Sequence, residues 1–269
     1  MECYRYPDDN DKILSSFVSQ KEPYQGYWAE SELNALKRVG DYLAEILVPR
    51  DRIRALDAGC GRGRAIPWIA KFASQIVAAD PDPARLADAR QVRPGDEYRR
   101  TQVEFHNVSV DKLRGEAFDL IVCNHVIQHV STTAAQDILS SLKALATPKS
   151  VLILSFSRSA VGHEIYGISF LNDGVPEFEI IDRMAFDSLA ASGGSKGYLP
   201  VRMIDPDKFA NDARTVGWKI EWSWTYHAAN WVDGETSFGS DNTINHVPAL
   251  LRQCQGDIYV AMRSDDWFT

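Results

Sequence analysis

The sequence predicts an α/β protein with a doubly wound, parallel sheet, and three observations lead to that fold class. Short apolar stretches alternate with helix-like stretches throughout residues 53–156. The first apolar stretch, residues 54–58, is followed at once by a glycine-rich turn. The next one, residues 75–79, runs into an acid, Asp80, and an acid at that strand end of a βαβ unit is well placed to accept hydrogen bonds from a ribose.

The turn after the first strand carries three glycines at alternate positions: Gly59, Gly61 and Gly63. Glycine suits a tight turn whose backbone N–H groups approach a ligand. The dinucleotide fingerprint G-x-G-x-x-G does not fit, because its third glycine would fall on Arg64 or on Ile66. A phosphate loop is excluded as well, since no Gly-Lys-Ser/Thr follows. What remains is the pattern Asp-x-Gly-x-Gly-x-Gly, which starts at Asp57.

This pattern resembles the first motif of the class I S-adenosylmethionine-dependent methyltransferases of the small-molecule type. Later stretches resemble further parts of that family in the same order: the strand end at Asp80, a third strand at 103–110, and residues 118–130, which look like the family's fourth motif. The resemblance implies a Rossmann-like methyltransferase fold, a doubly wound sheet of seven mostly parallel strands. Residues 218–226 and 257–262 would then form an antiparallel pair at its edge.

Helix signals fill the spaces between these strands. Apolar residues recur at helical spacing over 30–47, which predicts an amphipathic helix before the sheet. Pro83 opens a helix that we expect to reach residue 90. Ser131 or Thr132 caps the helix after the fourth strand. Pro148 is expected to end that helix before a buried strand at 151–156.

The chain is expected to be a single domain, residues 1–269, with four parts: an N-terminal helical cap at 1–50, a cofactor-binding core at 51–156, an insertion over the substrate side at 157–203, and the C-terminal part of the sheet at 204–269. A second insertion lies within the last part, at 227–256. Between the insertions, Asp205 and the proline after it mark a helix start, and Gly217 marks its end.

The resemblance implies S-adenosylmethionine as the cofactor and places its contacts at the strand ends. The expected contacts are Asp57, Gly59, Cys60, Gly61, Gly63, Asp80, Pro81, Ser109, Val110, Asn124 and His125. Asp57 would either face the ammonium side of the cofactor or order the loop beneath it, and Asp80 would accept the ribose hydroxyls. Many family members have an acid at the third motif, where this chain has Ser109, so the contact with adenine there is expected to be weaker.

Methyl transfer is an in-line displacement, so positioning of the nucleophile supplies much of the rate. An oxygen or protonated-amine nucleophile must also lose a proton, for which a histidine is suited. The candidates are His129, just after the fourth strand, and His163, in the first insertion. For His129 the alternative is a structural role, with the ring hydrogen-bonded to backbone.

Aromatic residues are dense before the first helix and recur in the first insertion. We expect contacts with the acceptor from Tyr24, Tyr27, Trp28 and Tyr166, as parts of a lid. The alternative for the first three is that their rings fasten the helix to the core.

Charge and motifs restrict the class of molecule that can accept the methyl group. A formal net charge of −8 and a pI of about 5.3 argue against sequence-independent binding to the phosphate backbone of nucleic acid. Residues 124–127 read Asn-His-Val-Ile rather than the Asn/Asp-Pro-Pro-Tyr/Phe of amino-methylating nucleic-acid enzymes, and no Pro-Cys nucleophile is present. We therefore expect transfer to O or N of a small-molecule metabolite, with no nucleic-acid partner, no membrane partner and no metal.

The four cysteines are scattered and the first residues lack an apolar signal-peptide core, so a cytoplasmic protein is expected. Two other functions stay open at this point: a regulatory protein that binds the cofactor without turnover, and a methyltransferase of a protein or a tRNA. The identity of the acceptor and the oligomeric state are also open.

Overall fold

A computed structural model describes residues 13, 27–47, 50–115, 117–159, 161–173, 175–193, 197–226 and 256–264, with the backbone alone at 27–29, 50, 175 and 176. The expected second insertion, 227–256, lies outside the described residues except for its last residue. Among the helices that are described, none combines the length and the apolarity needed to cross a bilayer.

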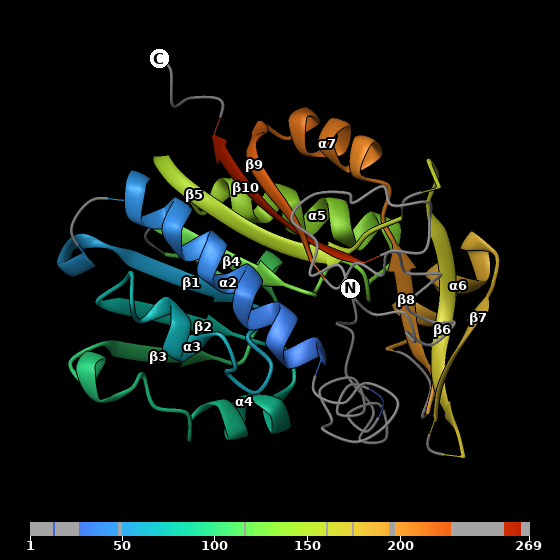
Figure 1. The fold of residues 1–269 in the computed structure, drawn as a ribbon, viewed down its shortest axis with the longest axis horizontal. Helices are drawn as coiled ribbons and strands as arrows, with labels where there is room; N and C mark the ends of the chain where they lie inside the picture. Colours follow the sequence, from blue (N-terminus) through green and yellow to red (C-terminus); the bar gives the residue numbers. More distant parts are fainter. Residues whose placement is uncertain are drawn as a thin grey trace.

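A seven-stranded sheet forms the centre of the molecule, in the order β3-β2-β1-β4-β5-β10-β9 (Figure 1). Its strands are β1 (Arg54–Ala58), β2 (Gln75–Ala79), β3 (Gln102–His106), β4 (Phe118–Asn124), β5 (Ala146–Ser157), β9 (Trp218–Tyr226) and β10 (Asp257–Ser264). The first five run parallel, and β10 pairs antiparallel with both β5 and β9. The predicted doubly wound, mostly parallel sheet of seven strands is confirmed.

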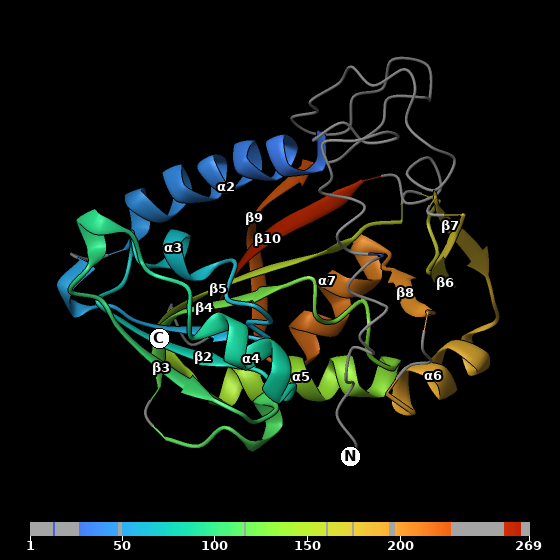
Figure 2. The same cartoon turned by 90° about the horizontal axis from the view of Figure 1, so that it is seen from below.

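Side-chain alternation along the strands divides the core between the two faces of this sheet. In β1, Leu56 and Ala58 belong to one hydrophobic cluster, whereas Ala55 belongs to the other. The helices on the two faces are α5 (Thr132–Ala144) and α7 (Pro206–Thr215) on the first, and α2 (Tyr27–Ile46), α3 (Ile66–Ile69) and α4 (Pro83–Ala89) on the second. Figure 2 shows α2 and α5 on opposite sides of the sheet.

Side-chain caps define the starts of these helices. The Asp82 carboxylate accepts from two backbone N–H groups at the start of α4, and the Ser131 hydroxyl accepts from Ala134 N at the start of α5. Ser131 is therefore the cap, rather than Thr132. The expectation that Pro148 ends α5 is wrong, because α5 ends at Ala144 and Pro148 lies within β5. The register between β4 and β5 shifts at this place, so the missing N–H of proline breaks no regular ladder.

A second, three-stranded antiparallel sheet occupies the expected first insertion, in the order β7-β6-β8. Its elements are β6 (Ile165–Asn172), β7 (Val175–Ile180), α6 (Arg183–Ala191) and β8 (Leu199–Met203). This small sheet stands beside the main one, at the right of Figure 1. The backbone N–H of Arg202 donates to the carbonyl of Gln128 at 2.8 Å, so β8 is tied to the loop that follows β4.

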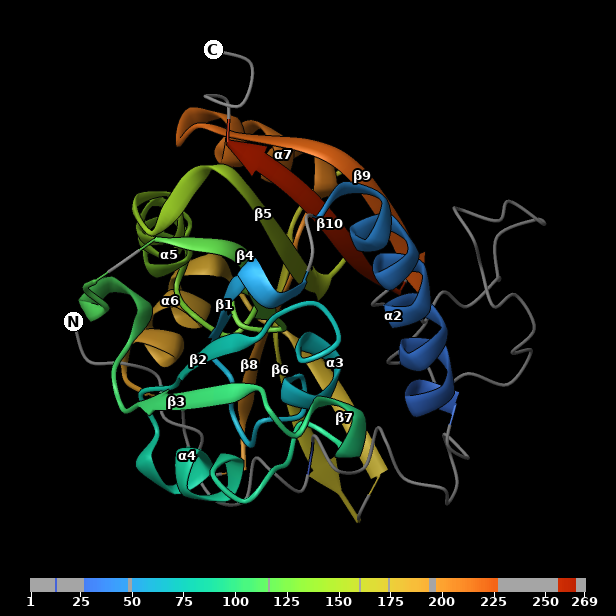
Figure 3. The ribbon, with the colours of Figure 1, turned by 90° about the vertical axis from the view of Figure 1, so that its left-hand side faces the viewer.

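Helix α2 packs along β9 at the other edge of the molecule (Figure 3). The ring of Tyr42 stacks on Trp222 with 5.4 Å between centroids, and the guanidinium of Arg38 lies 5.0 Å from the ring centroid of Trp224. Three short 3-10 helices complete the described structure: η1 (Arg50–Arg52), η2 (Asp96–Tyr98) and η3 (Val110–Lys112).

Candidate functional site

The glycine turn lies at the carboxyl end of β1, where parallel strands of such a sheet bind their ligands. All three glycines have positive φ: +73° at Gly59, +53° at Gly61 and +81° at Gly63. A Cβ atom on Gly59 would lie 2.4 Å from a methyl carbon of Val126, in the loop after β4. The turn therefore needs glycine for its conformation and for the close packing of these two loops.

Asp80 at the end of β2 ties two neighbouring strand ends together. Its Oδ2 accepts from the backbone N–H of Gly61 at 2.8 Å, and its Oδ1 accepts from that of Asp82 at 2.8 Å. Asn107 donates from Nδ2 to the carbonyls of Asp80 and Pro81, both at 3.0 Å. Burial raises the pKa of Asp80, and the two backbone N–H groups oppose that shift. The carboxylate is thus held in place beside the turn, with lone pairs left for further donors.

Two buried polar atoms near these strand ends have no hydrogen-bond partner among the described residues: Oδ2 of Asp57 and Oγ of Ser109. Asp57 is only 2% exposed, and burial raises its pKa to about 7, with Arg64 opposing and Asp80 adding to the shift. Buried polar groups are rarely left without a partner, so each of these atoms could accept a hydrogen bond from a bound molecule. Val110, beside Ser109, is buried and apolar.

The expected cofactor contacts at the end of β4 lie across the turn from Asp57. The carbonyl oxygen of the Asn124 side chain is 3.4 Å from Ser155 Oγ. His125 has φ +53°, a left-handed conformation that is uncommon outside glycine and that often marks a functional position. Its ring contacts Tyr226 Oη through Nε2 at 2.7 Å and Gln128 Oε1 through Nδ1 at 3.2 Å.

His129, the first candidate base, is 4% exposed. Its Nδ1 contacts the carbonyl of Pro200 at 2.7 Å, and its Nε2 contacts the Gln128 amide at 3.2 Å. Burial lowers its pKa to about 4, against the backbone contact with Pro200, so the ring is neutral at pH 7. These surroundings favour the structural alternative for this residue.

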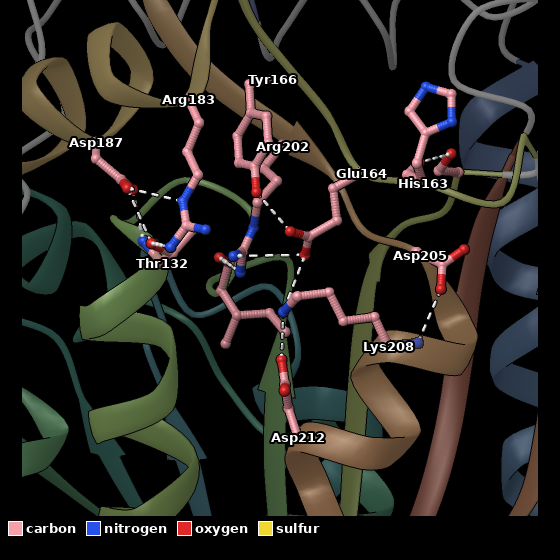
Figure 4. A network of polar contacts seen from close by, with 12 residues as sticks. Thr132, His163, Glu164, Tyr166, Arg183, Asp187, Arg202, Asp205, Lys208 and Asp212 are labelled. Carbon is pink, nitrogen blue, oxygen red and sulfur yellow. Dashed lines mark hydrogen bonds and ion pairs between the residues drawn. The ribbon is translucent and has the colours of Figure 1, made fainter.

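His163, the second candidate, is exposed, and its ring points away from the polar network that Figure 4 shows. In that network Tyr166 Oη donates to Glu164, while Nη1 of Arg202 lies 3.7 Å from Glu164 Oε1. Arg202 also donates to the carbonyl of Ile127 at 3.3 Å. Tyr166 therefore belongs to a polar cluster between β6, β8 and the loop after β4.

The side chains of some remaining candidates are not described by the structure. Tyr24 lies outside the described residues, and Tyr27 and Trp28 are described only as the first backbone turn of α2. Cys60 is buried, and burial raises the pKa of its thiol, so no thiolate is available there. Among the residues with described side chains, no group of three or more His, Cys, Asp or Glu is arranged to hold a metal ion.

Sequence reasoning missed three residues of this site. Tyr226 was expected only as the last residue of a strand, and Gln128 only as part of the fourth motif. Glu32 on α2 pairs with Arg64, the residue after the last glycine of the turn, and so joins the N-terminal helix to the site. The position of Arg64 beside the turn could have suggested an acidic partner, but nothing local in the sequence identifies Glu32, Gln128 or Tyr226 as residues of the site.

Residues 56–152, which span β1 to β5, match a protein family that is described as a methyltransferase domain. These residues carry a methyltransferase domain. This agrees with the order of the seven strands and with the glycine turn, and it confirms the resemblance seen in the sequence.

Solved methyltransferases share this fold over nearly the whole chain. The magnesium protoporphyrin IX methyltransferase of Synechocystis PCC 6803, solved with bound SAH, has a TM-score of 0.59 at 17% identity. The superposition covers 95% of this chain and 94% of that one. The 1,6-didemethyltoxoflavin-N1-methyltransferase of Burkholderia thailandensis has a TM-score of 0.54 at 17% identity, covering 98% of this chain and 92% of that one.

Among curated proteins, the ubiquinone biosynthesis O-methyltransferase of Rhodopseudomonas palustris (strain TIE-1) is 26% identical over 136 residues. That match covers 47% of this chain and 51% of the relative. The chain thus spans about half the length of the first curated relatives that it matches.

Proposed function

We propose that this chain binds S-adenosylmethionine at the glycine turn and transfers its methyl group to an oxygen or nitrogen atom of a small-molecule acceptor. The observation that carries the proposal is the pair of buried, unpartnered atoms, Asp57 Oδ2 and Ser109 Oγ, beside the turn. An ammonium donor would satisfy the first, and an adenine amino group would satisfy the second. Asp80, fixed between them by backbone N–H groups, would accept the ribose hydroxyls.

Each of these residues has a definite task in the proposed reaction. Bound S-adenosylmethionine supplies an electrophilic methyl group on a sulfonium sulfur. The glycine turn lets backbone approach the bound molecule without a clash, and Asp57 and Asp80 fix its ammonium group and its ribose by charge-assisted hydrogen bonds. Transfer in line then depends on how well the loop after β4 and the small sheet orient the acceptor.

The names of relatives support a small acceptor. The curated relative named above is an O-methyltransferase of ubiquinone biosynthesis, and the toxoflavin-type neighbour methylates a ring nitrogen, N1, according to its name. The net charge of −8 gives no support to a nucleic-acid acceptor. We also propose that the protein acts in the cytoplasm, since Cys60 and Cys123 are free thiols.

Calorimetric titration with S-adenosylmethionine and with S-adenosylhomocysteine (SAH) tests the first part, and we expect one site per chain. Turnover is then followed as SAH release with 3,4-dihydroxybenzoate, 4-aminobenzoate and a bulk tRNA fraction. Binding without release from any acceptor would favour the regulatory alternative. Release with tRNA alone would favour the nucleic-acid alternative. No binding of either compound would refute the proposal.

A further inference from the structure

The side chain of Gln128 is buried between two histidines, and its orientation is determined by a backbone group. Gln128 is 5% exposed, and the backbone nitrogen of Ser157 lies 2.7 Å from its Oε1. A backbone N–H can only donate, so the atom that faces it must be the carbonyl oxygen of the amide. The amide NH₂ must then point the other way.

This orientation determines the tautomer of His125. Its Nδ1 lies 3.2 Å from the same Oε1, which can only accept, so Nδ1 carries the proton. Nε2 of the neutral ring is then a lone pair, and it accepts from the hydroxyl of Tyr226 at 2.7 Å. The basic nitrogen of His125 is therefore directed at Tyr226.

The same amide determines the tautomer of His129. The NH₂ group of Gln128 lies 3.2 Å from His129 Nε2, which must accept, so the proton of His129 is on Nδ1. That proton is donated to the carbonyl of Pro200 at 2.7 Å. The hydrogen bonds from Ser157 to Pro200 thus have consistent directions, and the basic nitrogen of His129 is used by Gln128.

From these contacts we infer that Gln128 is a positioning residue that holds Nε2 of His125 as the proton acceptor of the site, with the Tyr226 hydroxyl as its link to the acceptor molecule. The inference rests on the proposed function. The loop that carries His125 packs on the glycine turn, because Val126 occupies the space beside Gly59. The proton acceptor is therefore next to the place where the methyl group would be presented.

The proton and electron balance of the step is as follows for a hydroxyl acceptor. The acceptor oxygen forms a bond to the methyl carbon, and the methyl–sulfur bond breaks with its electron pair left on sulfur. The acceptor's proton passes to the Tyr226 oxygen while the Tyr226 proton moves to Nε2 of His125. The resulting imidazolium returns its proton to solvent after product release.

Several groups face this pair. Tyr259 on β10 stacks on the Tyr226 ring with centroids 4.9 Å apart, and Asp257 on the same strand accepts from Ser157 Oγ at 2.8 Å. Burial raises the pKa of Tyr226 well above its ordinary value, with Tyr259 and Asp257 adding to the shift, so the phenol keeps its proton. Arg85 and His125 itself act on His129 and favour its neutral form.

Nitrogen NMR of the imidazole rings tests the positioning role without any acceptor. In protein labelled with ¹⁵N-histidine and saturated with SAH, we expect a protonated Nδ1 and a bare Nε2 for both histidines, with signals assigned from His125→Asn and His129→Asn. Gln128→Met should remove the preference at His125, whereas Gln136→Met, at an exposed glutamine of α5, should leave it unchanged. A protonated Nε2 on His125 in the parent would overturn the inference.

Turnover of 3,4-dihydroxybenzoate tests the role in catalysis. His125→Asn should lower kcat by about 10²–10⁴-fold, as loss of a general base does, with SAH affinity within about threefold of the parent. Gln128→Met should lower kcat less, and Gln128→Glu should recover part of the loss because a carboxylate also accepts from Ser157 and from His125.

The outcomes separate the two proposals. A His125→Asn enzyme with the parental kcat would overturn the inference and leave the proposed function intact. Failure of the parent to bind SAH would instead refute the proposed function, whatever tautomers the histidines adopt.

Discussion

The backbone N–H of Gly61 lies 2.8 Å from Oδ2 of Asp80, so the turn after β1 and the end of β2 hold each other in place. Parallel strands that are neighbours in the sheet bring these two residues to the same edge. The contact links the conformation of the turn to the residue expected to bind the ribose. The conformation of the turn and the binding of the ribose can both be measured on one variant.

Asp80→Ala removes the acceptor of Gly61 and the proposed acceptor of the ribose. Hydrogen bonds to charged groups contribute about 1.5–3 kcal/mol each, so we expect affinity for S-adenosylmethionine to fall by about tenfold or more. Titration calorimetry checks this, with Asp137→Ala, an exposed acid on α5, as the control. Equal affinities for Asp80→Ala and the parent would remove the ribose assignment.

Asp57 predicts a pH-dependent affinity. Burial raises its pKa to about 7, so the folded chain binds this proton more tightly than the unfolded chain does. Its contribution to stability therefore falls as the pH rises from about 4 to 7. A cofactor ammonium opposite Asp57 favours the charged form, so binding should release a proton and strengthen by up to about tenfold per pH unit from pH 5 to 7.

Calorimetry in buffers with different ionisation enthalpies measures that proton release directly. In Asp57→Asn both the release and the pH dependence should disappear. An affinity for S-adenosylmethionine that is flat with pH in the parent would show that Asp57 does not face the ammonium group.

Gly59 and Gly162 form a matched pair for separating strain from steric clash. Their φ angles are +73° and +75°, but a Cβ on Gly162 would meet nothing within 4 Å, whereas one on Gly59 would meet Val126. Alanine at either position should cost about 1–2 kcal/mol for the left-handed conformation. Gly59→Ala should cost a further 1–3 kcal/mol or so from overpacking, and should also weaken binding of the cofactor.

Urea denaturation of the two variants gives the difference in the free energy of unfolding, and titration with SAH gives the difference in affinity. If Gly59→Ala and Gly162→Ala are equally stable and bind equally well, the close packing of the turn on the loop after β4 has no consequence.

The polar network of Figure 4 predicts that removing the charge of Glu164 lowers the free energy of unfolding more than removing the charge of Lys208. The side chains of Arg202 and Glu164 are 5% and 8% exposed, while that of Lys208 is 44% exposed. Removing one partner of a buried pair costs about 3–5 kcal/mol, and the 3.7 Å separation here favours the lower end for Glu164→Gln. Lys208→Met should cost less than about 1 kcal/mol, as expected of a solvated partner.

The double variant Glu164→Gln, Arg202→Met sharpens this test, because removing both charges leaves no isolated cation in the small sheet. It should be more stable in urea than Glu164→Gln alone. A double variant that is less stable than either single one would show that Arg202 has a role beyond pairing with Glu164.

Much of the main sheet could be predicted because its signals are local. An apolar stretch such as 75–79, an acid at its end and a proline three residues after that acid are enough to place β2, its end and α4. Pro148 misled the prediction for the opposite reason. Whether a proline ends a helix or sits at a bulge depends on the register of the partner strand, which the local sequence does not contain.

The sequence by itself determined the fold class, the glycine turn at Gly59 and the acid at Asp80, since strand ends and tight turns depend on a few adjacent residues. Only the tertiary structure decided which histidine has a basic nitrogen directed at a neighbour. Tyr226 reaches His125 across 101 residues of chain, and Pro200 reaches His129 across 71. A tautomer is set by the partners of each ring nitrogen. Gln128 is local to both rings, but its orientation is fixed by Ser157 of β5, and Tyr226 and Pro200 come from other strands.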